Sequence, residues 1–237
     1  MKSIKDFDIE TKRVLLRCDF NVPLDEKGNI LDDFRIKKSL PTLQYAIQKN
    51  AKVILLSHLG SAKEAQVLRL TLDKVKERLE ELLGFSIEKA EDCVGLLVQE
   101  KVVKLESGSI LLLENVRLHK EETDNDLDFA KELASLGEIY INDAFSDCHR
   151  SDASIVGLPK YLPHGTGLLL EDEILRLDYI LQNLGSPFVV LVGGKKIETK
   201  APFIEKISER ADAVITSGLI KKEILEKNIT FSFPEKI

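Results

Sequence analysis

The chain has 237 residues, of which 43% are hydrophobic and 31% charged, and this composition excludes a disordered chain, a collagen-like repeat and a small disulfide scaffold. Its 34 basic and 40 acidic side chains give a net charge of −6, which argues against a general nucleic-acid binder but allows a local basic pocket. Short apolar runs, and an N-terminus without the apolar core of a signal peptide, predict a cytoplasmic protein with no membrane contact.

Short β-branched runs alternate with longer helical patterns over the first part of the chain. Strands are predicted at residues 14–17, 52–56, 86–88, 110–113 and 138–141, and helices at residues 39–49, 71–83, 96–105 and 126–136. Ser39 is expected to cap the first helix, with Pro41 in its first turn, and Gly84 to end the second. Apolar strands separated by helices predict an α/β fold with a doubly wound parallel sheet.

A long helical pattern follows at residues 167–184, after a segment rich in proline and glycine at 157–166 that predicts a loop. The strand and helix alternation then resumes, with strands at 188–192, 213–216 and 229–233 and helices at 199–211 and 220–227. We therefore expect one domain over residues 1–165, a connecting helix over 166–184, and a small partial second α/β unit over 185–237.

Polar side chains follow the predicted strands at their carboxyl ends, the edge at which open parallel sheets bind ligands. Four basic side chains are expected to meet there: Arg35, His58, Arg117 and Arg150. Guanidinium groups bind planar anions bidentately, so this pattern predicts a small ligand with phosphate and carboxylate groups. The alternative is a set of structural ion pairs that joins Arg17, Arg35 and Arg117 to Asp19, Asp33 and Glu114.

A short glycine turn with two lysines, at residues 193–196, follows the strand predicted at 188–192. It would place Lys196 beside a phosphate at the N-terminus of the next helix, although neither a Walker A nor a GxGxxG pattern is present. The three cysteines are widely spaced without a CxxC pair, which predicts a reducing compartment. The four histidines are too scattered to indicate zinc, and we predict no metal site.

Read together, these segments resemble the phosphoglycerate kinase family. The stretches that match are RCDFNVP (17–23), DDFRI (32–36), SHLG (57–60), LLLENVR (111–117), NDAF (142–145) and HR (149–150). The resemblance covers the N-terminal domain to about residue 165 and the interdomain helix that begins GLLLE. It extends less closely through residues 188–200, which are similar to the first strand and lysine loop of the nucleotide domain.

The resemblance implies phosphoryl transfer between ATP and 3-phosphoglycerate, a reaction of glycolysis, with ATP or ADP bound together with Mg²⁺. The residues that it implies for binding 3-phosphoglycerate are Asp19, Asn21, Arg35, His58, Arg117 and Arg150. It implies that Arg35 and Lys196 act in catalysis by stabilising the charge of the transferred group. For the nucleotide it implies contacts from Gly194, Lys196 and Lys200.

The chain departs from the family pattern beside the implied substrate residues. Ser61 stands where the family has an arginine, and Asp147 and Asp152 add negative charge, so we expect weakened substrate binding. The family's Gly-Gly-Asp-Ser/Thr phosphate loop is not found before Ile237, so the nucleotide site is expected to be incomplete. Three interpretations stay open: a kinase impaired alone, a non-catalytic phosphoglycerate- or anion-binding module, and half of a split kinase completed by a homodimer or a separate nucleotide-binding chain.

Overall fold

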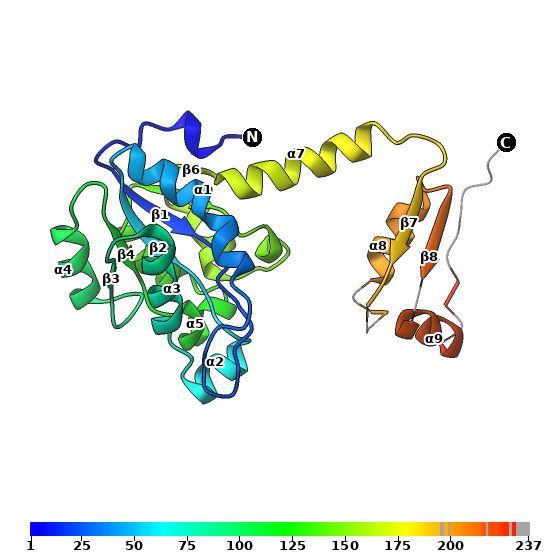
Figure 1. The fold of residues 1–237 in the computed structure, drawn as a ribbon, viewed down its shortest axis with the longest axis horizontal. Helices are drawn as coiled ribbons and strands as arrows, with labels where there is room; N and C mark the ends of the chain where they lie inside the picture. The colour runs from blue at the N-terminus through cyan, green and yellow to red at the C-terminus, as the bar shows by residue number, and fades with distance from the viewer. Residues whose placement is uncertain (195–196, 199, 217, 228, 231–237) are drawn as a thin grey trace. The chain divides into compact units, whose positions relative to one another are not determined.

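The structure is a computed structural model that describes residues 1–194, 197–198, 200–216, 218–227 and 229–230. The chain divides into two compact units, Met1–Leu175 and Arg176–Ile237 (Figure 1). Among the described residues, no helix combines the length and the apolar character needed to cross a membrane.

The first unit is built on a six-stranded sheet in the order β3-β4-β2-β1-β5-β6, and every pair of neighbouring strands is parallel. The strands are β1 (Arg13–Arg17), β2 (Lys52–Leu56), β3 (Glu88–Lys89), β4 (Ile110–Leu112), β5 (Ile139–Asn142) and β6 (His164–Thr166). The predicted parallel α/β sheet is therefore confirmed. Because the strands share one direction, the loops that follow them all begin at the same edge.

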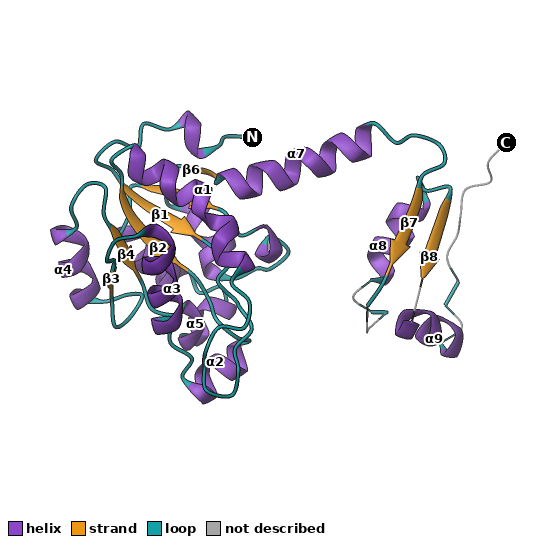
Figure 2. Cartoon of the chain, in the orientation of Figure 1, coloured by secondary structure: helices purple, strands orange, loops and turns teal. Residues whose placement is uncertain are grey.

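Helices cover both faces of this sheet, as Figure 2 shows. They are α1 (Phe34–Gln48), α2 (Ala62–Leu68), α3 (Asp73–Leu83), α4 (Leu96–Lys104), α5 (Lys120–Thr123) and α6 (Leu127–Ser135). Side chains alternate along β1, so that Leu16 packs in a core with α1 and α3 while Leu15 packs in a second core with α4 and α6. This double burial explains why the strands read as continuous apolar runs in the sequence.

The first helix begins earlier than predicted. Ser39 was expected as its cap, but α1 begins at Phe34 and the Ser39 hydroxyl donates a hydrogen bond to the Arg35 carbonyl at 3.3 Å inside the helix. Pro41 accordingly lies within α1 and not in its first turn. Ile36 is fully buried, so its burial extends the apolar face of the helix back beyond the proline.

The segment predicted as a loop at residues 157–166 contains a strand. β6 pairs with β5, placing Tyr140 opposite His164, and the N–H of Thr166 donates to the carbonyl of Lys2 at 3.0 Å. Pairing on both sides stabilises a strand whose sequence has no apolar alternation. A short 3₁₀ turn at Leu158–Lys160 precedes it.

The second unit contains a two-stranded parallel sheet. Helix α7 (Leu168–Gln182) begins in the first unit, and β7 (Val189–Val192), α8 (Ala201–Ser208), β8 (Ala213–Thr216) and α9 (Gly218–Glu226) follow it. A small core of buried side chains holds this unit together: Val192, Ile197, Ile204 and Ile220. The predicted small second α/β unit is thus confirmed. For the last predicted strand, residues 229–230 are not in a strand and 231–233 lie outside the described residues.

Candidate anion-binding site

The predicted ligand-binding residues of the first unit lie where its strands end. Arg17 closes β1 and is followed by Asp19, His58 comes two residues after β2, and Arg117 lies in a 3₁₀ turn after β4. The loop after β5 carries a second such turn, Phe145–Asp147, and then Arg150. The topology therefore brings to one edge of the sheet side chains that are far apart in the sequence.

Arg17 is the buried centre of this edge, with a side chain that is 0% exposed. Its guanidinium donates hydrogen bonds to the Cys18 carbonyl at 2.5 Å, to Ser154 Oγ at 2.9 Å and to Asp147 Oδ2 at 3.2 Å. It also lies 3.1 Å from His58 Nδ1. A buried charge is stable only when it is paired and hydrogen-bonded, and Arg17 meets both conditions.

His58 is held as a neutral imidazole. Burial first, and then the surrounding guanidinium groups of Arg17, Arg117, Arg150 and Arg35, hold the pKa of His58 far below its usual range. Since Arg17 donates to Nδ1, the proton of His58 lies on Nε2. The 3.3 Å approach of Nδ1 to Asp147 is therefore not an ion pair, and Nε2–H is available as a donor to a ligand.

Asp147 places a carboxylate among these cationic groups. Its Oδ2 lies against Arg17, and its Oδ1 lies 3.4 Å from Arg150 Nε. Burial raises the pKa of Asp147 above its usual value, and the guanidinium groups of Arg17, Arg117 and Arg150 offset only part of that effect. Asp147 thus partly neutralises the positive charge that an anionic ligand would meet.

Arg117 is buried with part of its hydrogen-bonding capacity unused. Nη1 donates to the Gly60 carbonyl at 2.7 Å, whereas Nε and Nη2 have no hydrogen-bond partner among the described residues. Nη2 lies 3.5 Å from Asp152 Oδ2, which has no hydrogen bond within the same described part of the chain. Buried donors without partners are costly, and a bound ligand is one physical reason for keeping them.

Asp19 connects the inner part of the site with its rim. Its Oδ2 accepts hydrogen bonds from Arg35 Nη1 at 2.5 Å and from the hydroxyl of Ser146, while Oδ1 accepts from the N–H of Asn21 at 3.0 Å. The Asn21 side chain accepts in turn from the N–H of Gly60 at 2.8 Å. These bonds hold the loop after β1 against the loop after β2.

The rim of the site is open to solvent. The side chains of Arg35 and Arg150 are 46% and 40% exposed. Asp19, Arg35, Phe145 and Ser146 contribute to the wall of a hollow of about 460 Å³. A small anion can reach the guanidinium of Arg35 from this hollow, because that side chain lines the hollow and is not buried.

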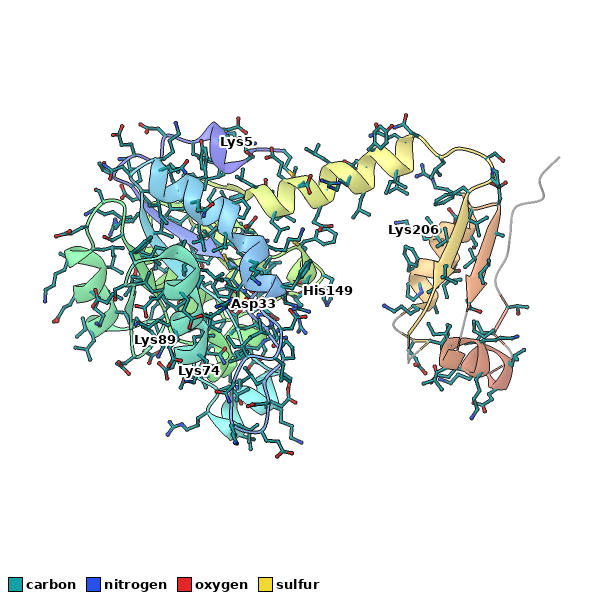
Figure 3. The ribbon with its side chains drawn as sticks, in the orientation of Figure 1. Lys5, Asp33, Lys74, Lys89, His149 and Lys206 are labelled. Carbon is teal, nitrogen blue, oxygen red and sulfur yellow. The ribbon has the colours of Figure 1, made fainter. Side chains whose placement is uncertain are left out.

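The ion pairs suggested by the sequence form only in part. Asp19 does pair with Arg35, but Arg17 and Arg117 face Asp147 and Asp152. Asp33, labelled in Figure 3, instead binds Arg78 and Lys37, while Glu114 binds Lys89. Asp33 and Glu114 therefore do not neutralise the arginines of the site.

Ser61 has a structural role that its position in the motif does not reveal. Its hydroxyl accepts from the N–H of Glu64 at 3.2 Å, and the Glu64 carboxylate accepts from the N–H of Ser61 at 2.8 Å. This capping box begins α2. The serine that replaces the family's arginine therefore stabilises the helix beside the site.

Asp143 joins this edge of the sheet to the start of α7. Its Oδ1 accepts from the N–H groups of Leu169 at 2.9 Å and Leu170 at 3.1 Å. A Cβ at Gly167 would lie too close to the same oxygen, so no larger residue fits there. The segment after β5 thus fixes both the anion-site loop and the first turn of α7.

In the second unit the predicted nucleotide residues are only partly described. Gly194 follows β7 with a φ of 147°, which favours glycine, and Lys200 occupies the N-cap position of α8. The Cε of Lys200 would lie 3.4 Å from a Cβ at Gly194, so the lysine lies beside the glycine turn. Lys196 lies outside the described residues.

Groups of three metal-ligating side chains occur among the described residues only in the first unit, and one of them is Asp19, His58 and Asp147. The guanidinium groups around that group make it unsuited to a cation. The described residues of the second unit offer no comparable set for Mg²⁺, and we derive no step through that metal.

The sequence did not indicate how the inner arginines are paired. Arg17 contacts Ser154 and Asp147, which lie 137 and 130 residues away in the chain. Glu122, fully buried, accepts from both the N–H and the hydroxyl of Ser154, and burial raises the pKa of its carboxyl.

The chain matches a known family over nearly all of its length. The family model for Phosphoglycerate kinase matches residues 4–230. The phosphoglycerate kinase of Coprothermobacter proteolyticus is 45% identical over 218 residues, which are 92% of this chain and 56% of that protein. The chain thus spans about half the length of the curated relatives that it matches.

Two solved structures show the same similarity in three dimensions. The crystal structure of phosphoglycerate kinase from Pyrococcus horikoshii has a TM-score of 0.87 and 34% identity, covering 97% of this chain and 58% of its own. That of phosphoglycerate kinase from Coxiella burnetii has a TM-score of 0.78 and 30% identity, covering 98% and 66%. On the combined grounds of motif, fold and sequence match, the chain belongs to the phosphoglycerate kinase family.

Proposed function

We propose that the carboxyl edge of the six-stranded sheet binds 3-phosphoglycerate, and that the chain takes part in phosphoryl transfer between ATP and this acid, as in glycolysis. The observation that supports this most is the state of Arg117, whose Nε and Nη2 are buried without hydrogen-bond partners among the described residues. Phosphate or carboxylate oxygens of a ligand would satisfy these donors through charge-assisted hydrogen bonds.

The proposed contacts divide by chemistry. Arg35, Arg117 and Arg150 supply positive charge to the phosphate and carboxylate, and neutral His58 donates from Nε2. Asp19 and Asn21 receive the ligand's hydroxyl. Both already hold neighbouring backbone groups, so they are positioned before the ligand arrives.

For catalysis, we propose that Arg35 and Lys196 stabilise the charge on the transferred phosphoryl group. Phosphoryl transfer depends on positioning and electrostatic stabilisation more than on covalent chemistry, so a cation at the exposed rim suits it. The Arg35 side chain is 46% exposed, so a ligand can approach its guanidinium from solvent. Gly194, Lys196 and Lys200 are the proposed contacts of the ATP or ADP phosphates.

We propose the cytoplasm as the site of this reaction. Cys18, Cys93 and Cys148 are free thiols, and Cys148 is exposed. A reducing compartment maintains such thiols.

Calorimetric titration of 3-phosphoglycerate into the 237-residue polypeptide tests the binding proposal, with glycerate and inorganic phosphate as comparison ligands. We expect 3-phosphoglycerate to bind most tightly of the three and its affinity to fall as salt is added. Equal affinity for all three ligands, or no binding at millimolar concentration, would overturn the proposal.

A second assay tests catalysis by following ATP formation from ADP and 1,3-bisphosphoglycerate with Mg²⁺. We expect the polypeptide to work orders of magnitude more slowly than full-length relatives, and Arg35→Ala and Lys196→Ala to remove the remaining turnover. A second copy, or a separate chain that brings the remaining nucleotide-binding residues, is proposed to raise the rate. Turnover unaffected by either substitution would exclude these catalytic roles.

A further inference from the structure

A second group of metal-ligating side chains lies outside the anion-binding site. Asp92 and Cys93 are in the connection between β3 and α4, and His119 ends the 3₁₀ turn that follows β4. One carboxylate oxygen, the thiol sulfur and one imidazole nitrogen all lie within 4.8 Å of one another. No described contact links this group to the proposed substrate residues.

The three side chains are held in place by the surrounding structure. Asp92 Oδ1 lies 2.6 Å from His119 Nε2, and it accepts the N–H of Cys93 at 2.6 Å. The His119 ring stacks on Phe129 with centroids 5.2 Å apart. Cys93 is fully buried, whereas the Asp92 and His119 side chains are 52% and 27% exposed. The group therefore has a thiol on its inner side and an approach from solvent.

We propose that Asp92, Cys93 and His119 bind one Zn²⁺ ion. Thiolate, imidazole and carboxylate are the three ligand types that zinc uses, and water fills the remaining tetrahedral position. In this step Zn²⁺ forms a bond to the Cys93 sulfur as the thiol proton leaves to solvent. The ring proton of His119 moves to Nδ1, so that Nε2 coordinates the ion.

The present geometry needs only a small opening to accept the ion. Ligand atoms about 2.0–2.2 Å from a tetrahedral zinc lie about 3.3–3.6 Å apart, compared with the 2.6 Å now between Asp92 Oδ1 and His119 Nε2. Both side chains are partly exposed, so their rotation is not blocked by a packed core. Zinc would thus take the place of the proton that lies between Asp92 Oδ1 and His119 Nε2.

The surrounding charge favours a cation here. Asp92 borders a hollow of about 440 Å³ whose wall carries these charged side chains: Glu88, Glu91, Asp92, Glu100, Lys101 and Lys104. Lys101 is already paired with Glu88. Asp19, His58 and Asp147, by contrast, lie among guanidinium groups. The difference in surrounding charge assigns the cation to Cys93 and not to the anion-binding site.

Cobalt provides the direct test, because Co²⁺ bound to a thiolate gives a charge-transfer absorption in the near ultraviolet. We expect the full chain, reduced and freed of metal, to show this band with one equivalent of Co²⁺, and added Zn²⁺ to abolish it. Cys93→Ser should remove the band, and His119→Gln should weaken Co²⁺ binding at least tenfold. Cys148→Ser and His149→Gln, at exposed positions, are the matched controls and should bind as the wild type does.

If Cys93→Ser perturbs the core, thermal unfolding of the wild type and the other variants still tests the proposal. Zn²⁺ should raise the Tm of the wild type and of both control variants, but not that of His119→Gln. The absence of a thiolate band in the wild type would overturn the proposal. So would a band lost equally in Cys148→Ser, since that result would place the metal at the exposed cysteine.

Discussion

The inner and outer arginines of the anion-binding site are used differently. Arg17 and Arg117 have side chains that are 0% and 2% exposed, and they contact buried carboxylates and backbone carbonyls. Arg35 and Arg150 are 46% and 40% exposed, and each pairs with a carboxylate on one side and meets solvent on the other. Arg17 therefore belongs to the fold, Arg35 and Arg150 remain available to a ligand at the rim, and buried Arg117 serves both roles because its Nε and Nη2 have no hydrogen-bond partner among the described residues.

This contrast separates stability from binding. Removing Arg17 takes the buried guanidinium away from the buried carboxylate of Asp147, whereas removing Arg150 leaves Asp147 still paired with Arg17. Substitution of Arg17 should lower the free energy of unfolding, and substitution of Arg150 should change affinity alone.

Arg17→Met should lower the free energy of unfolding by about 3–5 kcal/mol, because it leaves the buried Asp147 with only the partly exposed Arg150 as countercharge and frees Ser154 and the Cys18 carbonyl. Urea denaturation followed by circular dichroism measures this loss. The control is Arg17→Met combined with Asp147→Asn, which removes the uncompensated charge and should restore part of the stability. A loss below about 1 kcal/mol for the single variant would mean that Arg17 is not part of the fold.

Arg150→Ala should weaken 3-phosphoglycerate binding about tenfold or more, since a charge-assisted hydrogen bond contributes about 1.5–3 kcal/mol. Its free energy of unfolding should stay within about 0.5 kcal/mol of the wild type, because the side chain is at the surface. Calorimetry and urea denaturation measure the two quantities. Arg150→Lys, which keeps the charge but loses the planar donor geometry, should have an affinity between those of Arg150→Ala and the wild type. Unchanged affinity in both variants would place the ligand elsewhere.

Asp147→Asn should tighten 3-phosphoglycerate binding, because it removes a negative charge near the anionic ligand. We expect an effect of about tenfold, which corresponds to about 1.4 kcal/mol. Burial raises the pKa of Asp147, so in the wild type a fall in pH toward that value protonates the carboxyl and should strengthen binding. The Asp147→Asn variant has no titrating group at this position, and the difference between the two pH profiles therefore isolates Asp147 from the ligand's own titration. Parallel profiles would show that Asp147 does not oppose the ligand.

The raised pKa also fixes the sign of a stability effect. The folded state binds the proton of Asp147 more tightly than the unfolded state, so stability falls as pH rises through the interval between the unfolded and the folded pKa. At pH above that interval, the Asp147→Asn variant should have lost less stability than the wild type. Urea denaturation at several pH values provides the comparison.

Ser61→Arg should have the smallest effect. An added exposed cation should tighten 3-phosphoglycerate binding no more than about fivefold. The same change removes the capping hydroxyl of α2 and should cost about 1 kcal/mol of stability. Ser61→Ala is the matched control, because it loses the cap without adding charge and should leave affinity unchanged. Tighter binding by Ser61→Ala would show that the cap itself restrains the site.

The sequence predicts the sheet because its strands are buried on both faces and its helices carry one apolar face. It misplaces the start of α1, where Pro41 and Ser39 resemble a helix N-terminus although the helix continues through them. It also misses β6, whose residues pair only because β5 and the N-terminal segment lie beside them. Tertiary contacts outweigh local preference in both places.

For the site, as for the fold, the sequence predicts the general arrangement but not every contact. The edge of a parallel sheet gathers whatever follows its strands, so the convergence of Arg17, His58 and Arg117 follows from topology alone. Their partners do not, because the choice between Asp147 and Asp19 for Arg17 depends on how the loop after β5 turns back on β1. The capping role of Ser61 likewise requires knowing that α2 begins there.

A double-mutant cycle on Arg150 and Asp147, read out as the affinity for 3-phosphoglycerate, measures whether the Asp147 carboxylate competes with the ligand for Arg150. The Nε of Arg150 lies 3.4 Å from the Oδ1 of Asp147, so the carboxylate should take up part of the cation's interaction with the ligand. We predict that Arg150→Ala loses more affinity in the Asp147→Asn background than in the wild type, by about 0.5–3 kcal/mol of coupling. Equal losses in the two backgrounds would contradict the claim that Asp147 competes with the ligand for Arg150.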